Sequence, residues 1–140
     1  MTPSDLSNLT ARLIEAAKSA GADAADAIAI QGTSLTVDVR AGALEQAERS
    51  EGIDLGLRVF LGQKQANVSA SDISDRTIDE MATRAVAMAA EAPDDPHAGL
   101  ADPDQLAAAW DIDALELYDD TPEPSPADLQ NDALEAEAAA

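Results

Sequence analysis

The chain has 140 residues, which suffices for one domain with a hydrophobic core, and it carries 28 acidic against 8 basic side chains, a net charge of −20. This balance argues against direct binding to nucleic-acid phosphates, and the absence of cysteine excludes disulfides and thiolate metal sites. The charge is uneven, because residues 91–140 hold 15 acidic side chains and no Lys or Arg. No apolar run approaches the ~20 residues that a membrane span needs.

The first predicted element is a helix from Pro3 to Ala20. Residues 2–5, Thr-Pro-Ser-Asp, have the form of a capping box with proline in the first helical position. Apolar residues then recur with helical spacing, and Gly21 is the expected stop.

Five strands are predicted to follow as an antiparallel meander. The segment Ala43–Arg49 is ambiguous, because A-L-E-Q-A-E-R has good helix propensity but is too short for a stable isolated helix and lies between two turn signals. We interpret it as a strand. The five predicted strands are Ala27–Gln31, Leu35–Arg40, Ala43–Arg49, Ile53–Leu61 and Gln65–Ser71.

The fourth and fifth strands show the most regular pattern in the chain. Apolar residues occupy every second position from Ile53 to Leu61, which places them on one face of an extended strand. Gly62-Gln63 suits a tight reversal, and Ala66, Val68 and Ala70 continue the alternation on the return strand.

A second helix is predicted to start at Ser74 and to end before Pro93, with its apolar residues along one side. Residues 121–126 contain three prolines and are typical of a linker, and Ser125-Pro126-Ala127-Asp128 has the form of another helix cap. The helical spacing that follows continues to Ala140, which fits either a helix cut inside a longer protein or a frayed acidic tail.

These elements predict an α+β fold with two layers, a sheet of about five antiparallel strands packed by two helices. The predicted division is an α+β domain over residues 1–120 and a Pro-rich acidic linker with the start of a helix over residues 121–140. The polar face of the sheet is expected to carry Thr36, Asp38, Arg40, Asp54, Arg58, Asn67 and Ser69.

No catalytic, cofactor-binding or metal-binding residue is predicted in this chain. His97 is the only histidine, and it is interpreted as a surface turn residue rather than a general base. Four aspartates (Asp94, Asp95, Asp102 and Asp104) do not match the spacing of a calcium loop and are interpreted as solvated and cap-forming. Gly56, within a strand pattern, indicates a bulge or a close backbone approach rather than a phosphate site.

Three segments resemble the N-terminal region of the TldD/PmbA family, once labelled modulators of DNA gyrase. They are G-I-D-L-G-L-R-V-F-L-G-Q-K-Q-A-N-V-S-A-S-D-I-S from Gly52 to Ser74, A-P-D-D-P-H-A-G-L-A-D-P-D-Q-L-A from Ala92 to Ala107, and G-A-D-A-A-D from Gly21. The residues of the first two segments are more similar to the TldE (PmbA) branch, which lacks the metal motif H-E-x-x-x-H of the TldD branch. Because members of the family are considerably longer, the resemblance implies an N-terminal piece.

The resemblance implies a non-catalytic domain of a TldE-like subunit, and the lack of cysteine is compatible with a reducing cytoplasm, the predicted location. Such a subunit pairs with a TldD-like zinc subunit as a heterodimeric metallopeptidase, which cleaves unfolded peptides, peptide-antibiotic precursors and antitoxins. The domain itself is expected to hold no cofactor and to help admit extended peptide, by strand addition at an open sheet edge. The alternative is an acidic interaction module that engages a basic partner such as DNA gyrase, which the charge of residues 91–140 motivates.

Overall fold

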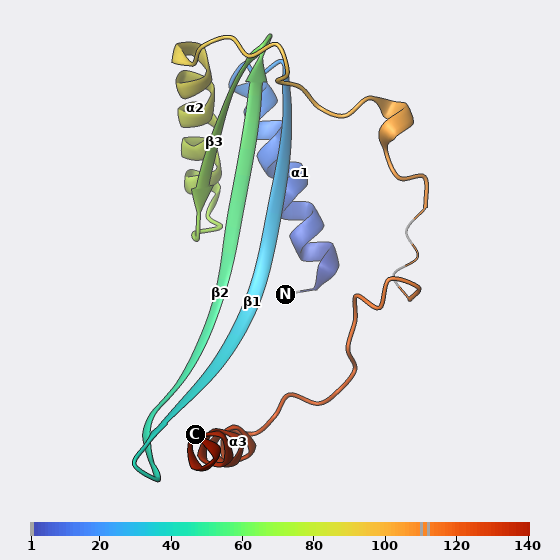
Figure 1. Cartoon of the computed structure of the whole chain (residues 1–140). Coiled ribbons are helices and arrows are strands. Elements are labelled where there is room, and N and C mark those ends of the chain that lie inside the picture. The colour runs from blue at the N-terminus through green and yellow to red at the C-terminus, as the bar shows by residue number, and fades with distance from the viewer. Residues whose placement is uncertain (1, 110, 112) are drawn as a thin grey trace. The chain divides into compact units, whose positions relative to one another are not determined.

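The computed structural model describes residues 2–109, 111 and 113–140. Its regular elements are α1 (Pro3–Ser19), β1 (Ala24–Arg40), β2 (Ala43–Leu61), β3 (Lys64–Ala70), α2 (Asp75–Glu91), a 3-10 turn (Pro103–Gln105) and α3 (Pro126–Ala139) (Figure 1). The chain divides into two units: unit 1 is residues 1–32 with 52–103, and unit 2 is residues 33–51 with 104–140. The predicted domain boundary at residue 120 stays a prediction.

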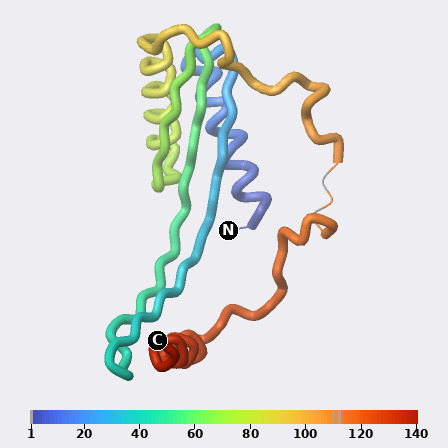
Figure 2. Tube along the Cα trace, viewed as in Figure 1, coloured from blue at the N-terminus to red at the C-terminus, as the bar shows by residue number. Residues whose placement is uncertain are grey.

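The strands form one antiparallel sheet in the order β1-β2-β3. Figure 2 follows the chain along β1, back along β2 and through the next reversal into β3. In the register of β2 and β3, Leu57 lies opposite Val68 and Val59 opposite Ala66. The α+β class and the antiparallel sheet are therefore confirmed, whereas the prediction of about five strands is wrong, because the described residues form three.

The difference has a simple cause in the backbone. The five predicted strands require chain reversals near Gly32 and Gly52, but neither glycine takes a positive φ, and the strands run straight through both. The reversals occur where left-handed residues stand, at Ala41 (φ 53°) with Gly42 (φ 76°) and at Gly62 (φ 57°). Ala43–Arg49 is extended, as predicted, but it belongs to the same strand as Ile53–Leu61.

The core of unit 1 is formed by one face of the sheet and by α1 and α2. Leu55, Leu57 and Val59 of β2 are almost completely buried, and Ile53 and Leu61 at the ends of the row are partly buried. Alanines supply much of the packing surface, so the helices can approach the sheet and each other closely. The other buried residues of this core are Leu9, Leu13 and Ala17 of α1, Ala25 of β1, and Ile78, Met81, Ala82, Ala85 and Ala89 of α2.

The helix ends follow the capping rules that the sequence indicated. Thr2 and Asp5 form a reciprocal capping box at α1, which ends at Ser19 before Gly21 (φ 106°). Ser74 is the N-cap of α2, and Ser125 with Asp128 forms the second capping box, at α3. No helix in the described residues is long and apolar enough to cross a membrane.

Truncation of Leu57 tests the central position of β2. Leu57 is 2% exposed, so Leu57→Ala is expected to lower the free energy of unfolding by about 2–5 kcal/mol. Met88→Ala on α2 is the matched control, because Met88 is 47% exposed, and its effect is expected to stay within about 0.5 kcal/mol. Urea unfolding followed by circular dichroism measures both, and equal midpoints for the two variants would contradict this core.

Candidate functional site

The outer face of the sheet in unit 1, opposite the two helices, is an open hollow of about 580 Å³. All three strands contribute to it: Asp26 and Ile28 from β1, Gly56 and Arg58 from β2, and Asn67, Val68 and Ser69 from β3, among others. We call this surface the outer sheet face. It combines apolar groups, one ion pair and small hydroxyl and amide groups.

Arg58 occupies the centre of the outer sheet face. Its guanidinium donates two hydrogen bonds to Asp26, with Nε 3.0 Å from Oδ1 and the second bond from Nη2 to Oδ2. The same group lies over the Phe60 ring, 5.1 Å from its centroid, in cation–π geometry. The hydrogen bonds that the guanidinium donates to Asp26 raise the pKa of Arg58 above its ordinary value. The arrangement holds the Arg58 cation in place across β1 and β2.

The apolar part of this face comes from β1. Ile28 and Ile30 are 55% and 52% exposed, whereas the alternate residues Ala25, Ala27 and Ala29 face the core. A Cβ on Gly56 would lie 2.8 Å from Cγ2 of Ile28, so the missing side chain gives Ile28 its place over β2. A close approach is therefore present at Gly56, but the Ile28 side chain makes it, whereas a bulge or a close backbone approach was predicted.

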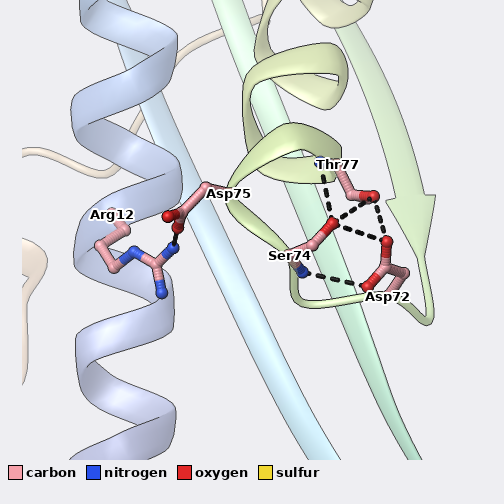
Figure 3. Close-up of polar contacts among 5 residues, drawn as sticks. All are labelled: Arg12, Asp72, Ser74, Asp75 and Thr77. Carbon is pink, nitrogen blue, oxygen red and sulfur yellow. Dashed lines mark hydrogen bonds and ion pairs between the residues drawn. The ribbon is translucent and has the colours of Figure 1, made fainter.

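A second hollow, of about 620 Å³, lies between α1 and α2. Arg12 of α1 forms an ion pair with Asp75 at the first turn of α2 across its rim (Figure 3). The acidic residues Glu15 and Asp79 also line it, together with the small residues Ala16 and Ala82 among others. The Arg12–Asp75 ion pair links the two helices across this groove.

Asp72 organises the start of α2. It accepts hydrogen bonds from the Thr77 hydroxyl and from the Ser74 hydroxyl (2.7 Å) and backbone N–H (3.0 Å), as Figure 3 shows. These bonds lower the pKa of Asp72 to about 2, and the bond from Thr77 makes the largest contribution. The perturbed carboxylate is fully engaged in capping a helix, so its shift marks a structural role.

The residues considered from the sequence as candidates for catalysis or metal binding, His97 and the four aspartates, are not gathered into a site. His97 is exposed in a turn, where its backbone N–H donates to Asp95 at 2.9 Å, as a surface turn residue would. The chain has one His and no Cys, and the described residues contain no group of three or more His, Asp or Glu that could hold a metal ion. A zinc ion therefore has no fitting ligand set here, and no step of chemistry through zinc is assigned to this domain.

Sequence reasoning missed that Ile28 and Ile30 face outward while alanines face the core. A rule that places the larger apolar residues in the core would bury the isoleucines of β1 and expose its alanines, which is the reverse of what the structure shows. The available signal was Asp26, which shares the parity of both isoleucines and needs a cationic partner on the neighbouring strand. Asp54, Arg58, Asn67 and Ser69 were expected on the polar face, and Arg58, Asn67 and Ser69 line the hollow there.

An antiparallel sheet with both helices on one face is a two-layer α+β domain. Residues 25–89 match the family model for the first domain of PmbA/TldA metallopeptidases. A curated relative, the metalloprotease PmbA homolog of Haemophilus influenzae, is 36% identical over 105 residues, which are 75% of this chain. The chain belongs to the PmbA/TldD family and contains its first, N-terminal domain. The matched region is 23% of that relative's length.

The pKa of Asp72 gives a test of the α2 cap. Thr77→Val removes the hydroxyl that contributes most to the shift, so the pKa of Asp72 is expected to rise from about 2 toward 3.8. Because the folded pKa is the lower one, the stabilisation from this cap is present above pH ~4 and is lost as the pH falls toward 2. Carboxyl carbon NMR titration measures the shift, with Thr83→Val on α2 as the control. An Asp72 pKa that is identical in both variants would contradict the cap.

Arg58→Lys tests the two-sided contact of the guanidinium. Lysine keeps the charge but loses the bidentate fork and the planar contact with Phe60, so we expect a loss of roughly 1 kcal/mol in unfolding free energy. Arg84→Lys on α2 is the control for a plain Arg-to-Lys change. Chemical denaturation at low and high salt measures both. An Arg58→Lys variant as stable as the control would show that the contact is not stabilising.

Proposed function

We propose that this chain is the non-catalytic N-terminal domain of a PmbA-branch (TldE-like) subunit, which pairs with a TldD-like zinc subunit in a metallopeptidase complex. Two findings support the proposal: the match to the first domain of the family, and the 36% identity to a relative named as a PmbA homolog. The surroundings of the exposed His97 support a non-catalytic role. In the described residues it belongs to no group of three or more His, Asp or Glu that could hold a metal ion.

The proposed role of the domain is to guide extended peptides toward the zinc subunit. In unit 1, β1 is an edge strand, and no other strand of the described chain pairs with its free side. The stretch Ala24–Gly32 contains no Lys, Arg or Pro to block strand addition, and its one charge, Asp26, is neutralised by Arg58. Unfolded peptides, peptide-antibiotic precursors and antitoxins, the substrates that the resemblance implies, would add here as a strand with alternate side chains beside Ile28 and Ile30.

The alternative, an acidic module that engages a basic partner such as DNA gyrase, has weaker support. Several carboxylates on which it would depend already serve the chain itself. Asp119 and Asp128 accept hydrogen bonds from Thr121 and Ser125, which lower the pKa of both carboxyl groups. Glu123 pairs with Arg49, and Glu137 binds backbone amides. We therefore favour the peptidase role.

The proposal is tested with the full-length subunit that contains this domain, mixed with the TldD-like subunit of the same genome. Cleavage of an unstructured peptide is expected only when both are present, and it should disappear when zinc is chelated. His97→Ala in this domain is expected to leave kcat/KM within about twofold, because a residue outside the chemistry contributes no transition-state stabilisation.

Three outcomes would overturn the proposal. Full activity of the TldD-like subunit alone would remove the need for pairing. A loss of 100-fold or more in kcat/KM on His97→Ala, in a variant with unchanged circular dichroism, would make His97 catalytic. Binding of gyrase at low salt, without any activation of peptide cleavage, would favour the acidic module.

A further inference from the structure

The turn between β1 and β2 presents two backbone amides to the same side. Ala41 (φ 53°) and Gly42 (φ 76°) are consecutive left-handed residues, as a two-residue hairpin turn requires. The N–H groups of such central residues are not needed for the strand ladder, and consecutive amides of this kind form a concavity that binds anions. The fitting ligand has two acceptor oxygens close together.

A carboxylate with this geometry fills the concavity. The Ala41 N–H donates to Oε1 of Glu137 at 2.7 Å, and the Gly42 N–H donates to Oε2 at 2.8 Å. Both distances are in the short range typical of charge-assisted hydrogen bonds. Glu137 stands near the end of α3, 95 residues beyond Gly42. Because each oxygen meets its own amide, the turn recognises a whole carboxylate.

Glu137 does not stabilise α3 itself from this position. An acidic side chain in the last turn opposes the helix dipole, and α3 has no basic residue there. No residue of α3 is fully buried, and its apolar side chains Leu129 and Leu134 are only half-buried. Two polar contacts join this part of the chain to the β1–β2 hairpin of unit 2: Glu137 at the turn, and Glu123, just before the helix, paired with Arg49.

From these contacts we infer that the Ala41-Gly42 turn is a carboxylate-binding site, which Glu137 fills in cis and which accepts another carboxylate when Glu137 is removed. The ligand class is a carboxylate presented by a flexible or helical segment, an Asp or Glu side chain or a peptide C-terminus. This property goes beyond the proposed peptidase role and does not depend on it.

The charge of unit 2 explains why the occupant is tethered. The unit holds 15 acidic and 2 basic side chains, which repel a free anion at low salt. A ligand on the same chain reaches an effective concentration of about millimolar, so two exposed hydrogen bonds suffice to keep it bound. A free carboxylate competes only when it is concentrated, at an ionic strength that shortens the Debye length to less than ~10 Å.

The test uses the whole chain with Glu137→Gln, and Glu135→Gln as the matched control. Both changes remove one exposed negative charge from the same helix. In Glu137→Gln, the amide protons of Ala41 and Gly42 are expected to move upfield in 1H–15N spectra and to exchange about tenfold faster, since a bond to a charged acceptor is lost. Glu135→Gln is expected to match the parent chain.

The second part of the test is a titration with sodium acetate, with sodium chloride at equal ionic strength as the control. Acetate is expected to move the Ala41 and Gly42 amides of Glu137→Gln back downfield and to saturate, while the parent chain, whose site is filled, does not respond. The inference is overturned if Glu137→Gln leaves both amides unchanged, if Glu135→Gln alters them equally, or if chloride reproduces the effect of acetate.

Discussion

The burial of one row of β2 beneath two alanine-rich helices is the constraint on which unit 1 depends. Leu55, Leu57 and Val59 are at most 2% exposed, and no buried side-chain polar atom in the described residues lacks a hydrogen-bond partner. Because the period of a strand is two, this burial fixes which residues face outward. Arg58 and Gly56 must then lie on the opposite face, where they meet Asp26 and Ile28.

The two faces of the sheet therefore differ in kind. The inner face is made of aliphatic side chains that can only pack. The outer sheet face holds an ion pair that is satisfied within the domain, two exposed isoleucines and a free strand edge. In the described residues this face combines apolar side chains with groups that can form hydrogen bonds. The role proposed for the domain, guiding extended peptides to a catalytic subunit, depends on this outer sheet face and its free strand edge.

Local signals in the sequence predicted much of this. The capping boxes at Thr2 and Ser125, the N-cap at Ser74 and the alternation from Ile53 to Leu61 all hold in the structure. The number of strands did not follow, because glycine permits a left-handed turn without requiring one. Gly42 and Gly62 adopt it, whereas Gly32 and Gly52 remain inside strands.

The outer sheet face was harder to predict because it depends on pairing across strands. Nothing local says that Asp26 meets Arg58, that Arg58 covers Phe60, or that Glu137 reaches a turn 95 residues away. Such contacts follow from register and tertiary packing. The cytoplasmic location and the absence of nucleic-acid binding likewise stay predictions from composition.

Native-state hydrogen exchange tests the central constraint most directly. Over Leu55–Leu61, β2 is paired with β3 and covers the core, so the amides of Leu57 and Val59 are expected to exchange only through global unfolding. Their apparent free energies of opening should equal the unfolding free energy from denaturation. Exchange at these two positions as fast as at the exposed residues Ala43–Gly52 would contradict the account.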